Sequence, residues 1–161
     1  MLLLAGVTLA ATGCGPKVIK GRPPLISISG MSLSGDRLTT VFDISNQNGI
    51  PMTINSTVIE VRVETTELTR YETRDELLID ANSTEEVRES HGVDSFTRTV
   101  LASLESGELK SLSFDLEGRV NTAEDGILRS ELKGYLYPVP GKPGHFRAAV
   151  TQAKGLVRED P

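Results

Sequence analysis

The chain has 161 residues, of which 38% are hydrophobic and 24% charged, a composition that suits one globular domain with a single core. Aromatic residues make up only 4% and tryptophan is absent, so platforms for stacking bases or sugar rings are not expected. The formal net charge of −5 excludes nucleic acid as the expected partner, because binding to phosphates requires a basic surface.

Residues 1–13 form an apolar segment, MLLLAGVTLAATG, that contains no charged side chain. It is too short to cross a bilayer, which takes about 20 apolar residues. An apolar run that ends in small residues is typical of a secretory signal peptide, which is removed and takes no part in the fold. We therefore predict a signal peptide over residues 1–13.

The signal segment ends in Ala-Thr-Gly-Cys at residues 11–14, which resembles the lipobox of bacterial lipoproteins. The resemblance implies cleavage before Cys14, a diacylglyceryl group on its sulfur and an acyl group on the new amine. More than one acyl chain is needed for stable anchoring, and as the only cysteine Cys14 cannot form an intramolecular disulfide. Gly15 follows in place of the aspartate that retains many lipoproteins in the inner membrane, which implies an outer-membrane anchor facing the periplasm. The alternative is a free cysteine behind an ordinary cleaved signal.

Residues 14–24 are predicted to be a lipidated cysteine followed by a tether, because glycine and proline punctuate the sequence GPKVIKGRPP. Residues 15–35 contain three basic residues (Lys17, Lys20 and Arg22) and no acidic residue. The other 14 of the 17 basic residues stand against 22 acidic ones, so residues 36 onward carry a net charge of −8. Anionic head groups would attract the basic segment and repel the acidic body. The alternative is a solvated linker with incidental lysines.

The body, residues 25–150, is dominated by alternation of apolar and polar residues, which is typical of antiparallel strands with one wet face. The alternation shifts at Gly30, as a β-bulge would cause, and Asp125-Gly126 is a hairpin signal. Residues 151–161 are predicted to be a polar C-terminal tail. Strands are expected at residues 26–33, 38–44, 59–63, 69–79, 84–90, 112–116, 128–136 and 145–150.

Residues 93–106 break the alternation, because Val93, Phe96, Val100, Leu101 and Leu104 fall at helical spacing. Asp94 or Ser95 can cap the start of a helix and Gly107 can end it. Seven or so strands with one helix predict a mainly β fold, an antiparallel seven-stranded immunoglobulin-like β-sandwich with one α-helix at about 93–106.

Residues 29–33, Ser-Gly-Met-Ser-Leu, precede a strand that runs into an Asn-rich turn with Asn46, Asn48 and Pro51. This order, with a late helix before the final strands, resembles the late embryogenesis abundant type 2 family, also called the water stress and hypersensitive response domain. The resemblance covers about residues 24–150 and implies a seven-stranded sandwich with no enzymatic activity. Turn chemistry alone also explains these residues, because asparagine caps backbone groups and tolerates positive φ, Gly49 adds that freedom, and Pro51 fixes the entry to the next strand.

We find no catalytic, metal or cofactor site in the sequence. His91 and His145 are the only histidines, whereas metal ligation favours clustered histidine and cysteine. No Gly-x-Ser-x-Gly nucleophile elbow is present, and residues 121–126 lack the spaced acidic ligands of a calcium loop.

The sequence therefore predicts a non-catalytic, membrane-anchored lipoprotein with a stress-protective or envelope-maintenance role, acting by binding. The membrane is its partner through Cys14, and an envelope protein or a lipid is a further candidate. The alternative function is a carrier for a lipid or other apolar molecule held between the sheets. An apolar cavity of a few hundred Å³ would favour the carrier, and a close-packed core would oppose it.

Overall fold

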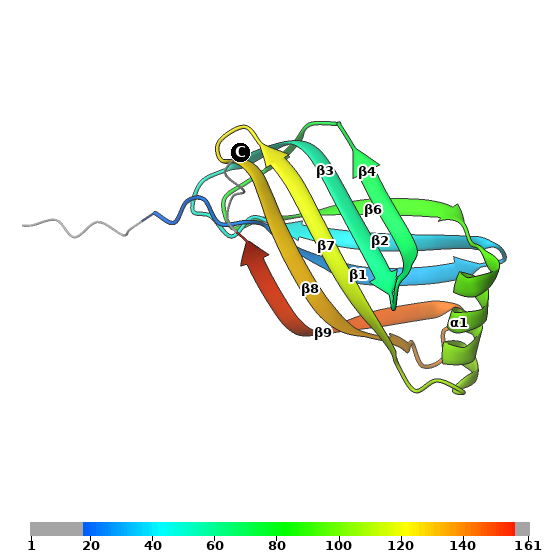
Figure 1. The fold of residues 1–161 in the computed structure, drawn as a ribbon. Coiled ribbons are helices and arrows are strands. Elements are labelled where there is room, and N and C mark those ends of the chain that lie inside the picture. Colours follow the sequence, from blue (N-terminus) through cyan, green and yellow to red (C-terminus); the bar gives the residue numbers. More distant parts are fainter. Residues whose placement is uncertain (1–17, 157–161) are drawn as a thin grey trace, which may run out of the picture.

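The computed structural model describes residues 18–156, so Cys14 and the predicted signal peptide lie outside the described residues. The described chain forms nine strands and one helix (Figure 1). Their bounds are β1 Leu25–Ser34, β2 Arg37–Ser45, β3 Met52–Val63, β4 Thr66–Thr73, β5 Leu77–Ile79, β6 Thr84–Gly92, α1 Ser95–Ser106, β7 Leu112–Thr122, β8 Gly126–Pro138 and β9 His145–Leu156.

The strands make one antiparallel sheet in the order β4-β3-β7-β8-β9-β1-β2-β6, with β5 paired to β3. The sheet curls so far that its two edge strands approach each other. His91 Nε2 on β6 lies 3.3 Å from the Leu68 carbonyl oxygen on β4, and the rings of Tyr71 on β4 and Phe42 on β2 lie 6.4 Å apart. The result is a nearly closed barrel in which β3, β4, β7 and β8 cross over β1, β2 and β6 (Figure 1). The prediction of a mainly β, antiparallel fold with a single helix is confirmed for the described residues.

The described residues form nine strands, whereas the alternation indicated eight ranges and the predicted sandwich has seven strands, and two local differences are found. The region predicted as one strand over residues 69–79 is divided into β4 and β5 by the residues around Asp75. The last strand continues past Val150 to Leu156, so residues 151–156, predicted as part of a polar tail, are paired with β8. Residues 151–155 are all exposed. The segment therefore lacks the alternation of apolar and polar residues that would predict a strand.

Strand alternation produces the core, because every second side chain of a strand points to the same face. In β7 the burial alternates without interruption from Leu112 to Thr122. The predicted bulge is present where the β1–β2 register shifts between Ile28 and Gly30, and the Asp125-Gly126 hairpin joins β7 to β8. The apolar side chains that point inward form one cluster, which includes Ile26, Leu38, Phe42, Ile59, Phe114, Leu116, Leu132 and Phe146.

Helix α1 lies at one end of the barrel (Figure 1). The Asp94 side chain accepts a hydrogen bond of 2.7 Å from the Thr97 backbone N–H, and Gly107 ends the helix in the left-handed conformation. Leu101 and Leu104 are fully buried. The predicted helix, its cap and its stop are thus confirmed, and its apolar stripe closes this end of the barrel.

The loop between β2 and β3, residues 46–51, lies at the opposite end. The buried Asn46 side chain donates to the carbonyl oxygens of Ile50, Ile79 and Asp80 at 2.8–3.2 Å. Its Oδ1 accepts from the Asn48 backbone N–H at 2.9 Å. The two asparagines therefore act through side-chain hydrogen bonds and not through positive φ, which among the described non-glycine residues occurs only at Glu64 and Asn82.

Gly49 also lacks the positive φ expected of it. Its role is steric, because a Cβ at this position would lie 3.3 Å from Val18 Cγ1 and the chain of residues 18–19 runs directly across it. The Gly49 N–H donates to the Ile19 carbonyl oxygen at 3.0 Å.

Candidate functional site

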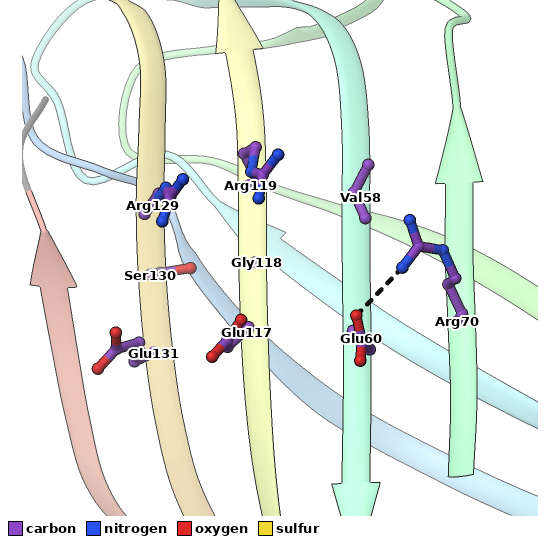
Figure 2. A pocket seen from close by; sticks show the side chains of 9 residues that line it. All are labelled: Val58, Glu60, Arg70, Glu117, Gly118, Arg119, Arg129, Ser130 and Glu131. Atoms are coloured by element: carbon purple, nitrogen blue, oxygen red, sulfur yellow. Dashed lines mark hydrogen bonds and ion pairs between the residues drawn. The ribbon is translucent and has the colours of Figure 1, made fainter. Parts of the chain in front are cut away.

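The outer face of β3, β7 and β8 carries charged side chains in three cross-strand rows. Cross-strand pairing sets Glu60 opposite Glu117, and Glu117 opposite Glu131. We call these three carboxylates the acidic row, and Figure 2 shows them side by side on three neighbouring strands. Directly opposed residues have Cβ atoms about 4.5–5.5 Å apart, so the carboxylates share one small area.

Two rows that contain cations flank the acidic row. On one side Arg119 is paired with Arg129, and Val58 continues this row on β3 (Figure 2). On the other side Asp115 lies between Arg62 and Lys133, and its Oδ1 is 3.0 Å from Lys133 Nζ. We call the three rows together the charged face. Its members are Val58, Glu60, Arg62, Asp115, Glu117, Arg119, Arg129, Glu131 and Lys133.

Glu60 is the most enclosed acid of the charged face, with only 14% of its side chain exposed. It forms ion pairs with Arg62 and with Arg70 of β4, the latter at 3.1 Å. A hydrogen bond from the guanidinium to the Glu72 carboxylate, above all, raises the pKa of Arg70. The β4 side of the charged face is therefore fixed by neutralising pairs.

Two hollows run along the acidic row. The first, of about 130 Å³, lies between the acidic row and the Arg119–Arg129 pair. The second, of about 230 Å³, lies between the acidic row and the row of Arg62, Asp115 and Lys133. Charged side chains predominate in the lining of both, so the hollows suit charged groups of a partner and not an apolar ligand.

Like charges directly opposite on neighbouring strands repel each other, and this repulsion acts mainly between Glu117 and Glu131, because Glu60 is neutralised by Arg62 and Arg70. The outward positions therefore do not follow the pattern that best stabilises the sheet, which is the behaviour expected of a binding surface.

The two histidines lie apart from the charged face and each contacts a backbone oxygen. His91 Nε2 is 3.3 Å from the Leu68 carbonyl oxygen, and His145 Nδ1 is 3.0 Å from that of Pro143. Among residues 18–156 no group of three or more His, Cys, Asp or Glu side chains is arranged to hold a metal ion. No helix within the same range is long and apolar enough to span a membrane.

The interior at two core glycines is closely packed. A Cβ added to Gly118 would collide with Ile26 Cδ1, and one added to Gly134 would lie 3.0 Å from two ring carbons of Phe114. The space beside both glycines is therefore already filled by neighbouring side chains. The hollows described above lie on the outer surface of the sheet, not between its layers.

The charged face was not predicted from the sequence. Its members were visible only as the polar positions of alternating strands, such as Glu117 and Arg119 around buried Gly118. The only sequence signal for this face was a charged residue at every second position in the segments that form β3, β7 and β8. Which charges meet depends on the strand register, which local patterns do not give.

No protein-family model matches the chain, and no curated protein matches it. Among solved structures, the chain is similar to a crystal structure of a protein from Archaeoglobus fulgidus, with a TM-score of 0.37 and 7% sequence identity. The match covers 90% of this chain and 100% of the other.

Proposed function

We propose that this protein is a non-catalytic lipoprotein of the bacterial envelope, anchored by acyl chains on Cys14, whose charged face binds another envelope component. The observation that carries the binding role is the acidic row, where the exposed carboxylates of Glu117 and Glu131 lie directly opposite each other and repel, beside the ion-paired Glu60. A partner with basic groups would relieve that repulsion on binding. The lipobox-like residues 11–14 carry the anchor.

We further propose that the domain is related to the late embryogenesis abundant type 2 family, with the two layers of the barrel corresponding to the two sheets of an immunoglobulin-like sandwich. The supporting features are the Asn46–Asn48 loop and the single helix that precedes the last strands. On this relationship the function is stress protection or envelope maintenance at the periplasmic face of the outer membrane.

The alternative, a carrier for a lipid or other apolar molecule, has less support. A carrier needs an apolar cavity, whereas side chains occupy the space beside Gly118 and Gly134 and the hollows have charged linings. A binding surface on the outside of the sheet requires no cavity.

The anchor is tested by recovering the protein from membranes of its host and measuring the mass of its N-terminal peptide. Acyl chains on Cys14 are expected, and an unmodified cysteine would remove the anchor from the proposal. Lipid that copurifies in fixed amount with the washed protein would favour the carrier.

The binding role is tested in a strain that lacks the gene and is complemented with variants. A double charge reversal, E117K with E131K, should lose the restored survival of drying or osmotic shock. The matched control, E67K with E108K, makes the same change in net charge at exposed positions outside the charged face. Equal survival of both variants would count against the charged face, and unchanged survival of the deletion strain would count against the protective role.

A further inference from the structure

One end of the barrel, opposite α1, collects the loop of residues 46–51, the β5 segment and the β7–β8 turn (Figure 1). The N-terminal segment also leaves the barrel at this end (Figure 1). We call it the N-terminal end. The contacts of residues 18–24 determine how far Cys14 can lie from this end.

Residues 18–24 are hydrogen-bonded to the loop of residues 46–51. The Asn48 side chain accepts from the Arg22 N–H and donates to the Arg22 carbonyl oxygen, both at 2.9 Å. Gly49 binds the Ile19 carbonyl oxygen, and both Pro23 and Pro24 are buried. We call these contacts the clasp. The clasp fixes the described start of the chain against the N-terminal end.

Cys14 is only four residues before Val18. An extended chain spans at most about 3.6 Å per residue, so Cys14 lies within about 14 Å of Val18. The strands are much longer, since a strand of the length of β3 extends over roughly 40 Å at about 3.3 Å per residue. A lipid on Cys14 must therefore lie near the N-terminal end and far from α1.

The exposed side chains of the N-terminal end suit a lipid surface. Seven large hydrophobic residues are exposed within the described chain, and four of them lie here: Val18, Ile19, Leu78 and Ile127, with 42–58% of each exposed. Lys20 and Arg22 lie at this end on the segment nearest to Cys14, and Asp80, Glu124 and Asp125 lie at the same end. Contact with the head groups therefore depends on the exposed apolar side chains, with Lys20 and Arg22 as the groups that anionic lipids would attract.

We propose that the N-terminal end of the barrel is a lipid-facing surface, held against the head groups by the clasp, with Val18, Ile19, Leu78 and Ile127 in contact with them. This orientation rests on the proposed lipidation of Cys14. It goes beyond that function, because an anchored domain on a free tether would have no fixed orientation.

The test uses the full chain, purified from membranes and reconstituted into vesicles of phosphatidylethanolamine and phosphatidylglycerol. Cys14 is the only cysteine, so its acylation leaves an engineered cysteine as the sole free thiol for a fluorophore. I127C reports on the N-terminal end, and A102C on exposed Ala102 of α1 is the matched control. The fluorophore at residue 127 should be quenched by nitroxide lipid head groups and shielded from iodide, and the one at residue 102 should show the reverse.

N48A should abolish the head-group quenching at residue 127 while the protein stays in the membrane fraction, because release of residues 18–24 lengthens the tether. V18D with I19D alters only exposed side chains and should lower the same quenching with the fold intact. Equal quenching at residues 127 and 102 in protein whose N-terminal peptide carries acyl chains would overturn the orientation alone. An N-terminal peptide without acyl chains would overturn the anchor, and the orientation with it.

Discussion

Replacing Asn48 with alanine should destabilise the domain through the clasp. Asn48 is 2% exposed, and its side chain makes three hydrogen bonds, two to the backbone of Arg22 and one to Asn46 Oδ1 at 3.1 Å. Each such bond contributes about 1 kcal/mol net, and partners left buried without a bond add to the loss. We expect the free energy of unfolding to fall by about 2–4 kcal/mol, a large part of the roughly 5–15 kcal/mol of a typical domain.

Urea unfolding of a soluble form that lacks residues 1–14 measures this loss. With a slope of about 1–3 kcal/mol per molar urea, the midpoint should fall by roughly 1–2 M. Hydrogen exchange gives a second reading, because the amides of Arg22 and Gly49 should lose protection before the strands do. The control is N55A at exposed Asn55, where a change within about 0.5 kcal/mol is expected. Midpoints that match between N48A and N55A, with protection at Gly49 unchanged, would refute the clasp.

Three further changes probe the core, the helix and the charged face. G134A should lower the free energy of unfolding by about 1–3 kcal/mol, because its Cβ would meet the Ala149 carbonyl oxygen. The control G30A adds a Cβ into open space. Equal urea midpoints for the two variants would contradict this packing. The Thr97 N–H lowers the pKa of Asp94 below its ordinary 3.8, so the stability from this cap is present above that pH and lost as the pH falls through the lower folded value. D94N keeps the cap without the titration, and its melting temperature should therefore vary less than that of the wild type below about pH 4. E117Q should raise stability by about 0.2–1 kcal/mol at low salt by relieving the acidic row, and a lower urea midpoint for E117Q would show that the row is not repulsive.

The features that the sequence predicted well depend on neighbours along the chain. Helix α1 needs only the spacing of Leu101 and Leu104, a cap at Asp94 and a stop at Gly107, all within 14 residues. The Asp125-Gly126 hairpin is equally local. Interactions between nearby residues determine these elements, so their sequence patterns can be interpreted without knowing the fold.

The features that the sequence did not predict depend on contacts between distant segments. The acidic row exists because Glu60 meets Glu117 across a register that also contains a shift between Ile54 and Ser56, and a slip by one residue would turn each of these side chains to the other face. The clasp joins Asn48 to Arg22, 26 residues earlier. Local composition therefore predicts a tether over residues 15–24 and gives no sign of the hydrogen bonds from Asn48 and Gly49 to Arg22 and Ile19.

The charged face and the proposed lipid-facing end lie on different parts of the barrel, so both can be in contact with a partner at the same time. The clasp holds the chain at the end where the β7–β8 turn lies, while the acidic row crosses β7 and β8 near their midpoints and β3 toward Val63 (Figure 2). If that end contacts the head groups, β3, β7 and β8 extend away from the membrane. The acidic row then lies on the side of the barrel and does not contact the lipid. A partner anchored in the same membrane could then reach Glu117 and Glu131 without displacing the domain. An intact clasp should therefore strengthen binding through the charged face at a membrane, whereas in solution N48A should leave that binding unchanged.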